Sequence, residues 1–285
     1  MTRTNSLRSL VAALGTMARQ ARSWWPQRAG SLPAGQRALD AFPRFADDPR
    51  RPPPRTPPTH LSISSPALGE MRVALDELRT VDLVSSRTSD FHCVTTWSAR
   101  GQTWTGVPLA AWWRARHGEL PSERFAVVGA ADGYRAVFRT DDLFADDVLL
   151  AWSLNGEPLD ARHGAPLRLV SPSQYGYKNV KHVESIELRF VEPPSALGPK
   201  EHLRARVAFE ERHTRVPGRV LRWPYRLVVP LTAMVAERTL ERSAGSDRRP
   251  GETRPPPPSE GIPPIACDRT HVRLCWCSWR RHFAR

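Results

Sequence analysis

The sequence has few cysteines for its length and no long apolar run, and each shortage excludes a class of protein. Only four of the 285 residues are cysteine, and three of these lie between positions 267 and 277. So few thiols do not make the disulfide framework of a secreted protein, which favours a reducing, cytoplasmic location. No stretch approaches the roughly 18 apolar residues of a membrane span. The N-terminus also lacks a secretory pattern, since its apolar run at 10–14 is short and no twin-arginine pair precedes it.

Lysine is scarce although the chain is strongly basic. The formal net charge is +13, yet only three of the 42 basic residues are lysines. Residues 1–60 hold ten arginines against three acids, and residues 241–285 hold nine against five. A nucleic-acid groove concentrates its positive charge on a folded face, so this distribution argues against specific nucleic-acid recognition. Binding of nucleic acid through the two basic arms remains an alternative hypothesis.

The two ends of the chain read as arms around one domain. Residues 1–34 form a basic, partly helical N-terminal arm, in which residues 6–25 place apolar side chains at helical spacing between arginines. That helix either makes peripheral contact with a membrane or lies on its own domain. Residues 244–285 are rich in proline and arginine and indicate a disordered tail. The spacing of the tail cysteines fits no usual structural zinc site.

Residues 35–243 form the predicted domain, which ends in a helical extension. A proline-rich connector at 49–58 precedes a series of short strand-like runs separated by turns, and the letters NGEP (155–158) predict a hairpin. Helices are expected at the segments 107–118, 140–147 (capped by Thr140) and 228–242. Many strands with few helices predict an α+β domain built on a mixed sheet.

Three sequence blocks carry the chemistry. The first, DFHCVTTWS (90–98), places Cys93 where a strand feeds a turn, and WSARGQTWTGVPLAAWW continues it, with the letters WTGV expected to close a turn. The second is HGAPLRLV (163–170). The third, YGYKNVK (175–181), contains two of the three lysines beside a glycine, a composition typical of an anion site. Taken alone, Cys93 is more commonly a small buried hydrophobe, and the lysines fit a solvated strand end.

Together these blocks resemble the molybdopterin-binding domain of the sulfite oxidase family, closest to its bacterial cytoplasmic and methionine-sulfoxide-reductase-like branches. The resemblance covers roughly residues 35 to 225, with the blocks in family order and spacing. It implies that fold, with extended basic termini, and molybdopterin as the cofactor. It also implies that the Cys93 thiolate binds molybdenum, and a soft thiolate suits a metal already held by sulfur.

The same resemblance implies the rest of the site. The residues expected to contact the cofactor, in addition to Cys93, are His92, His163, Arg168, Gly176, Lys178, Asn179, Val180 and Lys181. Arg168 and Lys181 would hold the pterin phosphate and His163 the pterin, while Tyr134 would lie with Cys93 in the catalytic pocket. Alternatively, His92 merely packs, His163 and Arg168 belong to an ordinary hairpin end, and Tyr134 has no role in the pocket.

The resemblance further implies oxygen-atom transfer on a small sulfoxide- or sulfite-like substrate, with a separate electron donor or acceptor protein. After Cys93, however, the chain reads Thr95-Thr96-Trp97-Ser98, where sulfite-oxidising members carry an arginine-bearing stretch. This departure argues against sulfite. An alternative hypothesis is a catalytically inactive scaffold of the same fold that acts as a peripheral or interaction protein.

Overall fold

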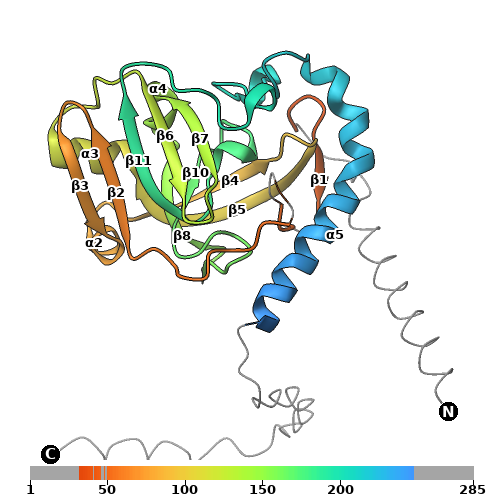
Figure 1. Ribbon diagram of the computed structural model, residues 1–285, viewed down its shortest axis with the longest axis horizontal. Helices are drawn as coiled ribbons and strands as arrows, with labels where there is room; N and C mark the ends of the chain where they lie inside the picture. The colour runs from red at the N-terminus through yellow and green to blue at the C-terminus, as the bar shows by residue number, and fades with distance from the viewer. Residues whose placement is uncertain (1–31, 41, 46–47, 49, 247–285) are drawn as a thin grey trace, which may run out of the picture. The chain divides into compact units, whose positions relative to one another are not determined.

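Two mixed β-sheets form the body of the protein (Figure 1). In the first sheet the strand order is β1-β5-β8-β10, with β4 beside β5 and β9 beside β8; in the second it is β3-β2-β11-β6-β7. Each sheet has one parallel pair, β1 with β5 and β2 with β11, and its other pairs are antiparallel. The predicted α+β class is confirmed, with two mixed sheets where the sequence indicated one.

The computed structural model describes residues 32–40, 42–45, 48 and 50–246, all within the unit Met1–Asp247. The strands are β1 (Arg37–Leu39), β2 (His60–Ser65), β3 (Gly69–Ala74), β4 (Ser85–His92), β5 (Trp97–Pro108), β6 (Phe125–Ala130), β7 (Arg135–Arg139), β8 (Leu149–Leu154), β9 (Glu157–Pro158), β10 (Arg168–Val170) and β11 (Val183–Arg189). The α-helices are α2 (Leu75–Thr80), α3 (Leu109–His117), α4 (Thr140–Leu143) and α5 (Arg222–Ser246), and the short 3-10 helices are η1 (Gly176–Lys178), η2 (Gly198–Lys200), η3 (Val207–Phe209) and η4 (Gly218–Leu221). The amphipathic segment 6–25 and the tail cysteines lie outside the described residues.

Several local expectations are confirmed because short-range chemistry fixes them. The hairpin between β8 and β9 turns at Asn155 and Gly156, both with positive φ, as a two-residue turn of the primed type requires. Helix α3 begins after Pro108 and ends at Gly118, whose φ of 80° closes the last turn. Helix α5 contains the expected segment 228–242 but begins earlier, at Arg222.

Two local expectations are wrong. Thr140 does not cap α4: the cap position is Arg139, no side chain caps the helix, and α4 is only four residues long. The WTGV letters do not form a turn but continue β5 as far as Pro108. Gly106 is needed there because an added Cβ would lie 2.2 Å from the Leu150 carbonyl oxygen of the neighbouring strand β8. The glycine therefore marks a close approach of two strands rather than a reversal of the chain.

The buried side chains form two cores, and the second prepares the site. The first core is mainly aliphatic and includes Leu61, Val107, Val128 and Ile186. The second is aromatic and includes Cys93 together with Phe91, Trp97 and Trp104. Phe42 joins these rings, with centroids 4.7 Å from Phe91 and 5.9 Å from Trp104. The cysteine thus lies in a rigid aromatic setting.

Between β11 and Ser246 the chain adds no strand but returns across the body. Helix α5 lies beside β1 in Figure 1 and buries Val229 and Ala236. Arg44 ties the helix down, because its guanidinium donates to the Ala236 carbonyl at 2.7 Å. The long C-terminal helix is thereby held against the N-terminal strand and the aromatic core.

Candidate cofactor and substrate site

The turn between β4 and β5 fixes the position of Cys93. The Cys93 amide donates to the Trp97 carbonyl at 2.8 Å, and the Thr96 amide donates back to the Cys93 carbonyl at 3.2 Å. Thr96 takes a φ of 76°, a left-handed conformation that a threonine rarely adopts. Gln36 also donates to the Cys93 carbonyl, at 3.1 Å. These hydrogen bonds hold both the amide and the carbonyl of Cys93, and so they fix the position of its sulfur.

The Cys93 thiol is buried and has a hydroxyl group as a polar neighbour. Its Sγ lies 3.1 Å from the Thr95 hydroxyl oxygen. Burial raises the pKa of the thiol above its ordinary value, opposed by the Thr95 hydrogen bonds and by the charges of Arg212 and Lys181. A thiol with a raised pKa is not a free nucleophile at neutral pH. Bonding to a metal removes its proton, and the two nearby cations favour the thiolate so formed.

Seven of the sequence-predicted residues line one cavity of about 540 Å³. They are Cys93, Tyr134, Arg168, Gly176, Asn179, Val180 and Lys181. These residues come from the β4–β5 turn, the β6–β7 turn, β10 and the η1 segment, which are far apart in the sequence. The fold therefore gathers the three sequence blocks around one space.

Arg168 presents a buried guanidinium that forms no ion pair with a carboxylate in the part of the chain that the structure describes. Its Nη1 donates to the His163 carbonyl at 2.9 Å and its Nη2 to the Asn179 carbonyl at 3.3 Å. The guanidinium also lies over the ring of Trp104, 4.7 Å from its centroid. Its Nε has no hydrogen-bond partner in the described part of the chain. Burial lowers the pKa of Arg168 to about 9, so the group remains a cation at neutral pH.

Lys181 is the second cation of the cavity. Its Nζ donates to the carbonyls of Phe45, at 3.1 Å, and Arg162, at 2.8 Å. Burial, and next the charge of Arg168, lower the pKa of Lys181 to about 7. Gly164, with a φ of 105°, allows the lysine stem to approach, because an added Cβ would lie 2.8 Å from the Lys181 Cβ. Within the described ranges, neither Arg168 nor Lys181 forms an ion pair with a carboxylate, although Asp132 also lines the cavity and its charge opposes the lowering of the Lys181 pKa.

The η1 segment forms a stiff wall between the two cations. The Asn179 side chain accepts a hydrogen bond from the Ser171 amide at 2.8 Å and donates to three nearby carbonyls. Gly176 lies against the ring of Phe91, and an added Cβ there would be only 2.6 Å from the Phe91 Cζ. Val180 is buried and accepts a hydrogen bond from Leu169. This wall supplies backbone surface rather than free side chains.

Tyr134 also lines the cavity, although its hydroxyl is already engaged. The Tyr134 hydroxyl donates to the Tyr177 carbonyl at 2.6 Å. Its ring therefore forms a fixed part of the wall, between the β6–β7 turn and η1.

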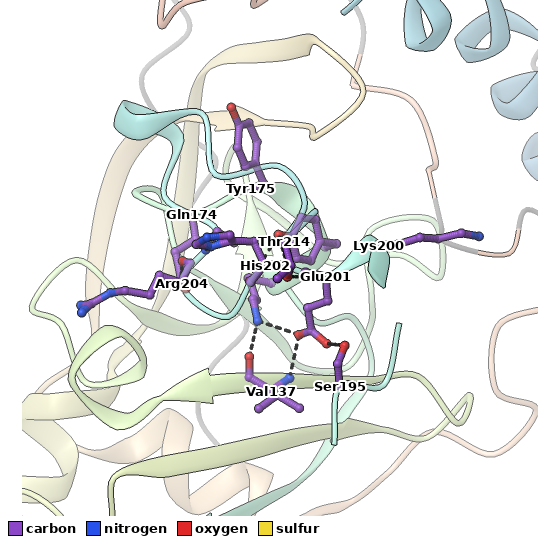
Figure 2. A network of polar contacts seen from close by, with 12 residues as sticks. Val137, Gln174, Tyr175, Ser195, Lys200, Glu201, His202, Arg204 and Thr214 are labelled. Carbon is purple, nitrogen blue, oxygen red and sulfur yellow. Dashed lines mark hydrogen bonds and ion pairs between the residues drawn. The ribbon is translucent and has the colours of Figure 1, made fainter. Parts of the chain in front are cut away.

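Three predicted contacts lie outside the cavity lining, and Lys178 differs most from expectation. Its ammonium is buried and pairs with the Glu201 carboxylate at 2.7 Å, beside the Val137 carbonyl. Glu201 in turn accepts hydrogen bonds from the Val137 amide and from Ser195 (Figure 2). Lys178 is therefore neither beside Lys181 nor solvated, and it anchors the segment that follows β11. η1 ends at Lys178, so Lys181 lies beyond the 3-10 helix and its ammonium reaches a different space.

The two histidines are packed rather than aimed at the cavity. His92 shares a hydrogen bond of 2.8 Å with Ser98 across the strand pair. His163 lies against Phe42, contacts the Phe42 carbonyl at 3.2 Å, and has a pKa lowered to about 4 by burial and by Arg168. The His163 carbonyl, not its ring, is what orients the Arg168 guanidinium.

No sequence pattern indicated the other side of the cavity, which the chain after residue 195 builds. This side consists of Ala196, Leu197, Lys200, His213, Tyr225, Val228, Val229 and Thr232. His213 contacts the Lys200 carbonyl through Nδ1 and the Tyr225 hydroxyl through Nε2. A carbonyl only accepts, so Nδ1 carries the proton and the Tyr225 hydroxyl donates to Nε2. The proline breaks and irregular turns of this segment carry no periodicity that would have revealed it.

Arg212 is a further residue that the sequence did not single out. It is fully buried, donates to the carbonyl of Val94 and stacks 4.9 Å from the centroid of Tyr175. Glu210 lies 3.6 Å from its Nη2. Its hydrogen bond to the Val94 carbonyl stabilises the turn that carries Cys93.

A cysteine, two cations and a stiff glycine-bearing wall around one cavity define a site for a bound anionic cofactor. The family model of the oxidoreductase molybdopterin binding domain matches residues 52–196. The chain therefore belongs to this family of molybdopterin-binding oxidoreductases, and molybdopterin is the cofactor of the domain.

Individual relatives agree with this assignment. The chain is 32% identical over 117 residues to the uncharacterized oxidoreductase YuiH of Bacillus subtilis, covering 41% of this chain and 58% of YuiH. It is 30% identical over 164 residues to the methionine-sulfoxide reductase catalytic subunit MsrP of Gluconobacter oxydans, covering 51% of this chain and 52% of MsrP. The matches thus span little more than half of either relative. The sulfane dehydrogenase SoxCD of Paracoccus pantotrophus has a TM-score of 0.40 and 22% identity, covering 47% of this chain and 38% of that chain.

The residues present fit the cofactor. The unpartnered Nε of Arg168 and the two cations without a carboxylate suit a terminal phosphate. Gly176 leaves room that a side chain would fill, and Cys93 lines the same space. A soft sulfur ligand is the donor expected for a metal held by a dithiolene.

Proposed function

We propose that the protein transfers an oxygen atom to or from a small sulfur-containing substrate at a molybdenum centre bound by Cys93. The observation that carries this proposal is that Cys93, Arg168 and Lys181 line one cavity. The similarity to MsrP, a methionine-sulfoxide reductase, supports sulfur chemistry. When bound, the cofactor supplies the two-electron redox chemistry, which is why the protein needs no catalytic triad or carboxylate pair of its own.

The residues of this chain have separate roles in the proposal. Cys93 binds the metal as a thiolate, and Arg212 and Lys181 favour that ionised form. Arg168 and Lys181 hold the pterin phosphate, each oriented by backbone carbonyls that keep its position fixed. Tyr134 closes the wall next to the substrate. The protein thus binds, orients and shields, and water is excluded by the aromatic core around Phe91.

The substrate side favours a neutral sulfoxide over sulfite. Val228, Val229 and Leu197 make this side largely apolar, and Lys200 is its one lysine. A dianion requires several fixed donors or cations, whereas a sulfoxide requires one donor and an apolar surface. Electrons enter or leave through a separate donor or acceptor protein in this proposal.

Metal analysis tests the proposal directly. The full chain is purified from a host that makes the cofactor, and molybdenum per chain and the visible spectrum are measured for the parent and for Cys93→Ser. We expect molybdenum near stoichiometry in the parent and a thiolate absorption band that Cys93→Ser abolishes. Cys267→Ser is the matched control and should keep both signals. Molybdenum far below stoichiometry in the parent would support the inactive-scaffold hypothesis instead.

Substrate assays test the finer part of the proposal. Sulfoxide reduction with a chemical electron donor and sulfite oxidation with a chemical acceptor are measured side by side on the loaded parent. We expect the sulfoxide reaction to dominate and its rate to fall by at least about 100-fold in the Cys93→Ser variant. Changing residues that only hydrogen-bond to a metal's ligands already lowers activity by about 10- to 100-fold. Dominant sulfite oxidation would overturn the substrate assignment while leaving the metal site standing.

A further inference from the structure

A row of apolar side chains faces outward along the first half of α5 and the preceding turn η4. We call this row the outer ridge; it consists of Val220, Trp223, Leu227 and Leu231. Trp223 is 71% exposed and Leu227 is 79% exposed. Seven of the twelve exposed large apolar side chains of the described residues lie between positions 209 and 231. Such a concentration marks an interaction surface rather than the usual scatter of surface apolar residues.

Helical spacing separates the outer ridge from the face that packs on the domain. Trp223, Leu227 and Leu231 follow one another at intervals of four and share one side of the helix. Val229 and Ala233 are buried on the opposite side. The inner face is explained by the cavity and the aromatic core. Nothing in the described part of the chain covers the outer ridge.

The segment that carries the ridge is basic and contains no acid of its own. Residues 213–236 contain four arginines and no aspartate or glutamate. Arg222 pairs with Glu210, and Arg226 lies over the Trp223 ring at 5.5 Å. Arg215 and Arg219 are exposed and have no ion-pair partner among the described residues. An occupant of this surface must therefore combine an apolar layer with negative charge.

We propose that the outer ridge docks the protein on the surface of an anionic lipid bilayer. Tryptophan and leucine would enter the boundary between headgroups and acyl chains, while the arginines contact lipid phosphates. No helix in the described ranges is long and apolar enough to cross a membrane. In the proposed contact, α5 lies on the surface of the bilayer. Because Tyr225, Val228 and Val229 of the same helix line the cavity, docking holds the substrate side of the site close to the bilayer.

A second copy of the chain fits this surface less well than lipid does. A twofold contact between two ridges would bring the arginines of one copy against those of the other, which is unfavourable. A stable protein interface also needs about 800 Å² on each partner, more than four partly exposed side chains supply. An anionic bilayer complements both the charge and the small apolar area.

Vesicle partitioning of the full chain tests the proposal. Binding to vesicles of equimolar phosphatidylglycerol and phosphatidylcholine is compared for the parent, Leu227→Glu/Leu231→Glu and Arg219→Gln. We expect the double variant to lose at least about tenfold in partitioning, because it places two charges at the apolar boundary. Arg219→Gln should lose about fivefold, as one surface cation near anionic lipid is worth about 1 kcal/mol. Pure phosphatidylcholine should bind the parent more weakly.

Leu68→Glu is the matched control, since Leu68 is also exposed (54%) but lies in the β2–β3 turn, at the other end of the domain in Figure 1. It should partition like the parent, and all variants should keep the parent's melting temperature. Hydrogen exchange with vesicles present should slow at residues 218–236. Partitioning of the double variant equal to that of the parent, or slowing absent from 218–236, would overturn the proposal. So would a concentration-dependent dimer that the double variant dissociates without any change in vesicle binding.

Discussion

The two sides of the cavity are built on different physical terms. The side that comes from residues 52–196 carries Cys93, Arg168 and Lys181, and its cations are held by backbone carbonyls. The side that comes from later residues is mostly apolar, with the His213–Tyr225 pair as its main polar feature. Charge without a carboxylate partner suits a permanently bound anionic group. An apolar wall on a single helix suits a substrate that enters and leaves.

The two sides are joined by a buried ion pair that contacts neither the thiol nor the cavity. Lys178, in the middle of the YGYKNVK block, pairs with Glu201 of the later segment. The neighbouring lysine, Lys181, keeps its charge for the cavity. Lys178 therefore attaches the later segment, whereas Lys181 lines the cavity. Variants of each lysine should affect different properties.

The largest effect is expected for Lys178→Met. This change leaves the Glu201 carboxylate buried without its cation, which costs about 3–5 kcal/mol of the free energy of unfolding. Denaturant unfolding of the cofactor-free protein measures the loss. Lys200→Met, one position before Glu201 but exposed, should change the free energy of unfolding by less than about 0.5 kcal/mol. Equal stability of the Lys178→Met variant and the parent would show that the pair does not anchor the later segment.

The next largest effect is expected for Lys181→Met, on cofactor affinity rather than on the fold. Removing one charge-assisted bond to the pterin phosphate should weaken binding by about 10- to 100-fold. The rate of cofactor loss during dialysis, followed by molybdenum content, measures this change, with Lys200→Met as the control. Retention equal to that of the parent would remove Lys181 from the phosphate site.

A smaller effect is expected from Val228→Ala on the substrate side. Val228 is half exposed, so its truncation should leave molybdenum content and melting temperature unchanged. The lost apolar contact should raise KM for an aliphatic sulfoxide by about two- to fivefold with kcat preserved, since a buried methylene is worth about 0.8 kcal/mol. A lowered molybdenum content would show that this helix also contacts the cofactor and that the two sides are not distinct.

The finest comparison is the titration of Lys181 itself. Its pKa of about 7 lies below the usual 10.5, so in the cofactor-free protein the ammonium loses its proton near neutral pH. Between these two values the unfolded chain binds more protons than the folded one, so Lys181 contributes a rise in stability with pH across this window. Only three lysines exist in the chain, so ¹⁵N-lysine NMR distinguishes them. Added inorganic phosphate should raise the Lys181 midpoint, and an unchanged midpoint would argue against an anion at this amine.

Much of the local structure was predictable because neighbouring residues determine it. The Asn155-Gly156 hairpin and the strand-to-turn position of Cys93 both follow from short-range backbone preferences. The Thr140 cap and the WTGV turn failed for the opposite reason. At Gly106 the close approach of the Leu150 carbonyl overrode the local turn preference. At Thr140 the backbone amide donates to the Arg124 carbonyl at 3.1 Å, and the helix begins without a side-chain cap.

Some residues of the candidate site were likewise predictable from the sequence, and others were not. The sequence blocks located Cys93, Arg168 and Lys181, and the family match agrees with the fold and the cofactor that they implied. The blocks could not separate Lys178 from Lys181, because η1 ends at Lys178 and the two ammonium groups reach different partners. Nor could they reveal Arg212, Tyr225 or the helix wall.

The amino-acid order by itself therefore determined many of the elements, the cofactor class and the residues proposed for the cofactor site, since these depend on side-chain chemistry and short spacing. Which cations reach the cavity, what faces them and where the apolar surface of α5 lies depended on packing between segments that are not neighbours in the sequence. Long-range burial decides which charges stay free and which are neutralised, and no local pattern records that outcome.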